Sequence, residues 1–135
     1  MIVDTSAILA FFDRDEPDHE AVAAVISQSA EPLVVSPYVV AEVDYLVGTR
    51  LGVAAEIAAL RELASGAWDL ATIDSTDLTS ILPIIERYGD HAIGVADASN
   101  VVLADRYGTT TIATLDRRHF SMLRPLSGSY FAIVP

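Results

Sequence analysis

Short apolar runs alternate with longer helical patterns along most of this 135-residue chain. The runs are rich in Val, Ile, Leu, Thr and aromatic residues, which pack well on a pleated sheet. Because these runs are apolar throughout, they are typical of parallel strands that are buried on both faces. We therefore expect five strands, at Met1–Asp4, Pro32–Ser36, Trp68–Ile73, Thr110–Thr114 and Tyr130–Val134.

Six helices are expected between these strands. Pro17 suits the first turn of a helix, and Gly52 separates two helical patterns. Gly89 and Gly108 each follow a predicted helix end, where glycine is a common cap. The predicted helices are Thr5–Phe12, Pro17–Ser29, Pro37–Leu51, Val53–Ser65, Ser75–Tyr88 and Gly94–Tyr107.

Alternating strands and helices predict a three-layer α/β/α sandwich around a central parallel sheet of four to five strands. The expected strand order is 3-2-1-4-5, and such sheets bind ligands beyond the carboxyl ends of their strands. No internal repeat, low-complexity segment or linker divides the chain, so residues 1–135 are expected to form a single domain.

Two missing residue types exclude several kinds of chemistry. Without cysteine the chain has no disulfide, thiolate zinc site or thiol nucleophile. Without lysine it has no Walker A motif, Schiff base or Ser–Lys dyad. No apolar stretch reaches the roughly 18 residues of a membrane span, and Asp4 argues against a signal peptide. We expect a soluble, cytoplasmic protein.

The charge balance is strongly negative. Eight arginines stand against 19 acidic residues, which gives a net charge of −11. This charge disfavours nucleic acid as a partner, because phosphate binding usually leaves a basic footprint. It favours a cationic partner, such as a metal ion or a basic protein segment.

Four acidic residues occupy unusual positions. Asp4 and Asp116 directly follow the first and fourth predicted strands, where each could instead cap the next helix. Glu42 and Asp97 lie inside apolar helical patterns, where the alternative is a register that turns the carboxylate to solvent. All four are expected to project into one cleft at the same sheet edge.

A cluster of carboxylates favours a hard divalent cation, because the cation relieves their mutual repulsion. Oxygen ligands without cysteine favour Mg²⁺ or Mn²⁺ over Zn²⁺, and these ions activate water for attack on phosphates. Asn100 lies on the same helix face as Asp97, and Thr114 places a hydroxyl near Asp116. His19, His91 and His119 show no spacing typical of a metal-binding or catalytic pair.

Three segments, MIVDTSAIL, SPYVVAEVDYL and GVADASNVVLADRYGTTTIATLDRRHF, resemble in their order the PIN-domain family. The resemblance covers nearly the whole chain and is greatest to the VapC-type toxins of bacterial type II toxin–antitoxin systems. It implies a PIN-like fold and a Mg²⁺- or Mn²⁺-dependent endoribonuclease that cleaves RNA. It also implies a homodimer and inhibition by a cognate antitoxin protein.

The resemblance assigns roles to individual residues. Ser6 and Thr114 are implied to be polar residues beside the acids. The metal-binding and catalytic residues are implied to be Asp4, Glu42, Asp97 and Asp116.

Further residues are candidates for supporting roles. Asp90 is an additional acid expected near the site. Arg117 and Arg118, close to Arg124 and His119, are candidate contacts for RNA phosphates, although ordinary solvated surface is the alternative. An amphipathic antitoxin helix could dock on Pro37–Leu51 and Val53–Ser65, with candidate contacts at Tyr38, Tyr45, Leu46 and Leu60, each of which could instead be core.

Two other functions share parts of this pattern. A receiver-like signalling domain also binds Mg²⁺ at strand ends, but it needs a lysine that this chain lacks. A catalytically inactive PIN-like binding module, in which the acids serve only as helix caps, is the second alternative. Metal titration distinguishes it, since an inactive module gains no thermal stability from Mn²⁺.

Overall fold

The computed structural model describes all 135 residues and has a five-stranded parallel sheet at its centre. The strand order is β3-β2-β1-β4-β5, and Ile2 of the central strand lies opposite both Val34 and Ile112. The predicted α/β/α class and strand order are therefore confirmed. The strands are β1 (Ile2–Val3), β2 (Val34–Val35), β3 (Asp69–Leu70), β4 (Thr111–Ala113) and β5 (Ala132–Val134), all shorter than predicted.

Seven α-helices and one short 3₁₀ helix surround the sheet. They are α1 (Thr5–Phe12), α2 (His19–Gln28), α3 (Pro37–Leu51), α4 (Val53–Leu63), α5 (Ser75–Tyr88), η1 (Gly89–His91), α6 (Val95–Arg106) and α7 (Arg117–Met122). The predicted bounds of α1, α3 and α5 match the structure to the residue.

The predicted bounds of α2, α4 and α6 differ from the structure by one or two residues at one or both ends. The predicted roles of Pro17, in a first turn, and of Gly89, as a left-handed cap, are also wrong. Helix α2 begins at His19 after Asp18, so Pro17 precedes the helix and does not occupy its first turn. At Gly89 the backbone stays right-handed, with φ of −57°, and continues into η1; the left-handed residue that ends this segment is Ala92. Gly108 does adopt the predicted left-handed conformation, with φ of 61°.

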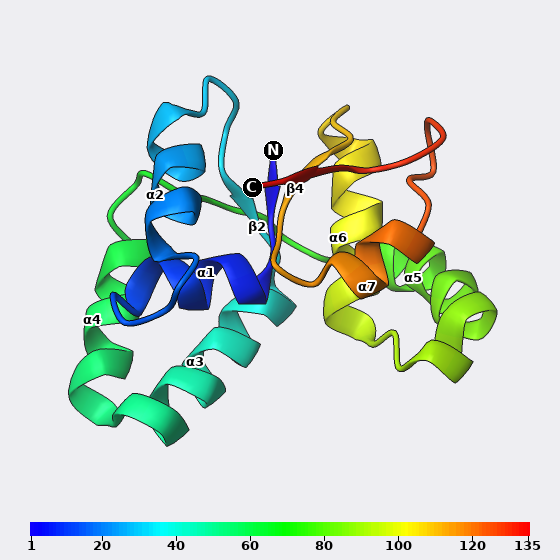
Figure 1. Cartoon of the computed structure of the whole chain (residues 1–135). Helices are drawn as coiled ribbons and strands as arrows, with labels where there is room; N and C mark the ends of the chain where they lie inside the picture. The colour runs from blue at the N-terminus through cyan, green and yellow to red at the C-terminus, as the bar shows by residue number, and fades with distance from the viewer.

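The sheet separates two hydrophobic cores. Figure 1 shows α1 to α4 on one side of the sheet and α5 to α7 on the other. Val3 and Val35 point into the first core, whereas their strand neighbours Ile2 and Val34 point into the second. This alternation follows from the period of two along a strand, and it buries both faces of the central strands. Both edge strands differ from prediction, because both residues of β3 are exposed and no residue of β5 is fully buried.

Several helix starts gather at the carboxyl edge of the sheet. Helices α1, α3 and α7 begin directly after the parallel strands β1, β2 and β4. Helix α6 starts at the same edge, as its first turn lies near α7 in Figure 1. The predicted acids lie on these helices or at their caps. None of the helices combines the length and apolar character needed to span a membrane.

Candidate functional site

The four predicted acids line one cavity. It has a volume of about 790 Å³ and opens at the carboxyl edge of the sheet. We call it the acid cavity, and its charged lining residues are Asp4, Glu42, Arg50, Asp97, Asp116 and His119. The sequence prediction that these acids converge on one cleft therefore agrees with their placement.

Asp4 is the most buried of the four, with 5% of its surface exposed. Its Oδ2 accepts hydrogen bonds from the Ser6 hydroxyl at 2.9 Å and the Thr114 hydroxyl at 2.8 Å, and its Oδ1 accepts one from Asn100 Nδ2 at 3.2 Å. Burial raises the pKa of Asp4, although the hydrogen bonds from Thr114 and Ser6 oppose that rise. Asp4 also caps α1, so the cap and site interpretations both apply to this residue.

A hydroxyl network ties together the two strand ends that carry acids. The Ser6 and Thr114 hydroxyl oxygens lie 3.0 Å apart. The backbone N–H of Leu115 donates to Ser6 Oγ at 2.9 Å, and that of Asp116 donates to Thr114 Oγ1 at 2.9 Å. The β1–α1 and β4–α7 junctions are thereby held at a fixed spacing.

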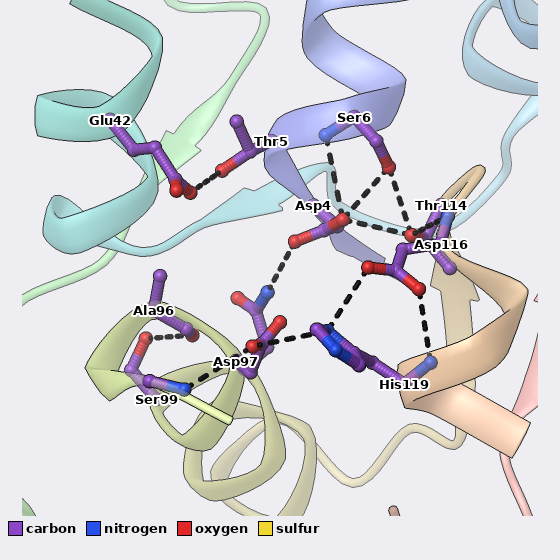
Figure 2. A network of polar contacts seen from close by, with 12 residues as sticks. Asp4, Thr5, Ser6, Glu42, Ala96, Asp97, Ser99, Thr114, Asp116 and His119 are labelled. Atoms are coloured by element: carbon purple, nitrogen blue, oxygen red, sulfur yellow. Dashed lines mark hydrogen bonds and ion pairs between the residues drawn. The ribbon is translucent and has the colours of Figure 1, made fainter. Parts of the chain in front are cut away.

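His119 bridges two carboxylates across the cavity. Its Nδ1 lies 3.0 Å from Asp116 Oδ2 and 3.5 Å from Asp97 Oδ2 (Figure 2). Asp116 caps α7 and accepts a hydrogen bond from the His119 backbone N–H at 3.0 Å. The sequence analysis missed this histidine. Its spacing of three residues from Asp116 was the available signal, whereas Asp97 approaches it only through the tertiary fold.

The pKa of Asp97 is raised to about 6. Burial is the largest cause, and the charge of Asp4 adds to it, with a smaller contribution from Asp116. The backbone N–H of Gly94, which donates to Asp97 Oδ2 at 3.4 Å, and the nearby His119 act in the opposite direction. The acid cavity therefore disfavours a further negative charge.

Glu42 is placed differently from the three aspartates. It is exposed, as the alternative helix register predicted, yet it still lines the acid cavity. Its Oε2 accepts a 2.6 Å hydrogen bond from the hydroxyl of Thr5, which the sequence analysis did not single out. In Figure 2 this pair lies on one side of Asp4, and Asp97 with His119 lies on the other.

Five predicted supporting residues lie outside the acid cavity lining. Thr114 and Asn100 reach the site through their hydrogen bonds to Asp4, and the other three are Asp90, Arg117 and Arg118. Asp90 is exposed in η1. The Arg117 guanidinium donates to the carbonyl oxygen of Pro135, and Arg118 is exposed on α7. The arginine that lines the cavity is Arg50, near the end of α3.

The donor set fits a hard cation. The charges of Asp4 and Asp116 raise the pKa of Asp97, and a bound dication would relieve this repulsion. The buried Oδ1 of Asn100 has no hydrogen-bond partner. No three acidic or histidine side chains stand close enough to hold one ion as they are placed, so binding would require side chains to rotate.

Comparisons with known proteins agree with this geometry. The PIN-domain family model matches residues 1–124. Ribonuclease VapC26 of Mycobacterium tuberculosis is 62% identical over 135 residues, which covers all of both chains.

Two solved structures share the fold. The structure of VapC20 of Mycobacterium tuberculosis, described as a sarcin-ricin loop cleaving toxin, superposes with a TM-score of 0.84 at 16% identity, covering 99% of this chain and 98% of that one. FitAcB from Neisseria gonorrhoeae superposes with a TM-score of 0.64 at 22% identity, covering 88% and 89%.

Proposed function

This chain belongs to the PIN-domain family, and from that premise we propose that it is a metal-dependent endoribonuclease toxin of the VapC type. The observation that carries the proposal is the convergence of Asp4, Glu42, Asp97 and Asp116 on the acid cavity. Residues 1–135 would act as a single PIN domain. The lack of lysine and the family match leave no support for a receiver-like signalling domain.

The cofactor is proposed to be Mg²⁺ or Mn²⁺, held by the three aspartates with Glu42 nearby. When bound, such an ion supplies positive charge to the phosphate and promotes attack by water. Oxygen donors and the absence of cysteine favour these hard ions.

The protein's own groups prepare the site. Ser6, Thr114 and Asn100 fix both oxygens of Asp4, so that this carboxylate needs little reorganisation. His119 holds Asp97 and Asp116 near each other. Thr5 occupies only Oε2 of Glu42, which leaves Oε1 free to accept a hydrogen bond from water in the cavity.

The substrate is proposed to be single-stranded RNA or an RNA loop, whose backbone can enter a cavity of this size. The overall charge of −11 opposes tight, unselective RNA binding. We therefore expect cleavage of few RNAs and few positions.

The partners are proposed to be a cognate antitoxin and a second copy of the chain. A cavity of about 490 Å³ lies among α1 to α4. Tyr45 on α3 and Leu60 on α4 do not line it, but they are 68% and 36% exposed. These two remain candidate antitoxin contacts. Tyr38 and Leu46 instead line the acid cavity, so they are candidates for contact with RNA.

The decisive experiment is incubation of the purified protein with total bacterial RNA, with and without Mn²⁺, followed by sequencing of the new RNA ends. The parent is expected to produce discrete new ends only with Mn²⁺. Asp4→Ala and Asp97→Ala should each reduce cleavage at least about a hundredfold, because each removes an ion ligand. Asp90→Ala is the matched control, since Asp90 is an exposed acid outside the cavity.

The same experiment distinguishes the proposed ribonuclease from a catalytically inactive binding module, in which the acids serve only as helix caps. That alternative has some support, because Asp4 and Asp116 do cap α1 and α7. Asp97→Ala cleaving RNA as fast as the parent would contradict the proposed site. Absence of any cleavage by the parent would favour the inactive module.

A further inference from the structure

One face of helix α3 forms a wall of the acid cavity. Four residues spaced four apart, which share a helix face, all line it: Tyr38, Glu42, Leu46 and Arg50. A helix rises 1.5 Å per residue, so Arg50 lies about 12 Å along the axis from Glu42. The wall therefore carries the Glu42 carboxylate near the three aspartates and the Arg50 guanidinium farther along the helix.

Arg50 is distinguished from the other seven arginines by its surroundings. Four of these already contact other groups of the chain: Arg87, Arg106, Arg117 and Arg124. Among the four that remain, which are Arg14, Arg50, Arg61 and Arg118, only Arg50 lines the acid cavity.

The guanidinium of Arg50 is free to bind a ligand. It is exposed and takes part in none of the chain's ion pairs. Arg50 also lines a smaller adjoining cavity of about 150 Å³ together with Asp13 and Glu16, but it forms an ion pair with neither. The position thus joins the acid cavity to the outer surface.

An RNA strand that enters the acid cavity brings phosphates toward several carboxylates, which repel them. A guanidinium offsets this repulsion with a directional, bidentate contact to phosphate. We propose that Arg50 binds an RNA backbone phosphate next to the reacting one and so sets the path of the strand along α3. This inference rests on the proposed ribonuclease function.

The test compares Arg50→Gln, Arg50→Lys and Arg61→Gln. Arg61 is a matched control because it too is exposed and lies in the last turn of its helix, α4, outside the acid cavity. The probe is a fluorescent pool of random-sequence, single-stranded 20-nucleotide RNA. Binding is measured by anisotropy in Ca²⁺ over a series of salt concentrations, beside cleavage of total bacterial RNA in Mn²⁺.

Arg50→Gln is expected to weaken binding about tenfold and to lower the slope of log affinity against log salt by about one, since one phosphate contact is lost. Subsaturating cleavage should slow by a similar factor. Arg50→Lys should keep the salt slope while binding more weakly than the parent, and Arg61→Gln should match the parent.

The outcomes separate the two proposals. If the parent cleaves RNA while Arg50→Gln and Arg61→Gln both match it in affinity and salt slope, the role of Arg50 is overturned and the ribonuclease stands. Arg50-dependent binding without cleavage supports the contact and contradicts the enzyme. If the parent neither binds nor cleaves RNA, both proposals fall.

Discussion

Asp97 illustrates how a single side chain couples stability to pH. Its pKa of about 6 exceeds the ordinary value of 3.8, so the folded state binds its proton more tightly than the unfolded state does. The stability contributed by this proton is complete below about pH 4 and is lost as pH rises through about 6. The raised pKa of Asp4 acts in the same direction.

In metal-free buffer, ionisation of Asp97 alone is expected to lower the free energy of unfolding by on the order of 1–2 kcal/mol between about pH 4 and pH 7. This figure allows for solvent screening. Urea denaturation with a chelator, repeated across this range, measures the free energy of unfolding. Asp97→Asn, which carries no charge at any pH, should be more stable than the parent at pH 7 by that amount and equal to it at pH 4. A constant difference between the two proteins would contradict the assignment.

For individual residues, the sequence predicted which acids lie at the site better than it predicted the contacts that these acids make. Asp4, Glu42, Asp97 and Asp116 stood out because an acid is costly in apolar surroundings or follows a strand directly. Their neighbours could not be derived in the same way. Whether Asn100 reaches Asp4, or His119 reaches Asp97, depends on how α6 and α7 pack against β1 and β4.

Thr114 connects two structural elements and one carboxylate of the acid cavity. Its hydroxyl donates to Asp4, accepts from the Asp116 backbone N–H and lies beside Ser6. Thr114→Val keeps the shape but removes one hydrogen bond to the buried Asp4 carboxylate and leaves the Asp116 backbone N–H without its partner. We expect about 1–3 kcal/mol lower stability and a larger fall in cleavage than that stability loss explains, because Asp4 and Asp116 lose their relative positions.

Thr114→Ser is the control for this prediction, since it restores the hydroxyl and removes only a methyl group. Stability comes from urea denaturation, and cleavage is measured under conditions where each variant is fully folded. Equal cleavage by Thr114→Val and Thr114→Ser would show that the hydroxyl does not position the acids.

Helix boundaries were easier to predict than strand boundaries for a physical reason. Helix α3 is bounded by Pro37 and by Gly52, whose φ of 85° suits glycine, and both signals are local. A strand ends where its neighbour stops pairing. The residues that precede β1 and β2, Met1 and Leu33, are as apolar as the strands, so the sequence could not show where the pairing begins.

For the whole molecule, the net charge of −11 makes a bound dication a source of stability. Millimolar Mn²⁺ at pH 7 is expected to raise the melting temperature, because a ligand at a hundred times its Kd adds about 2.7 kcal/mol to the folded state. The increase should shrink near pH 4.5, where protonated carboxyl groups no longer bind the ion.

Calorimetry or dye-based melting measures this shift. Asp97→Asn should lose most of it, and Asp90→Asn, which removes the same charge outside the acid cavity, should keep it. An equal shift in both variants would mean that Mn²⁺ binds elsewhere on the acidic surface.

The pairing of Asp4 with Thr114 has a consequence for how the protein is made. Asp4 and Asp116 come from opposite ends of the polypeptide. Strand β4 must therefore be in place beside β1 before Ser6, Thr114 and Asp116 can meet. A nascent chain still emerging from the ribosome therefore carries Asp4 but no finished cleavage centre. The proposed ribonuclease can become active only after synthesis has passed α7, and an inhibitor has that time to meet the newly completed molecule.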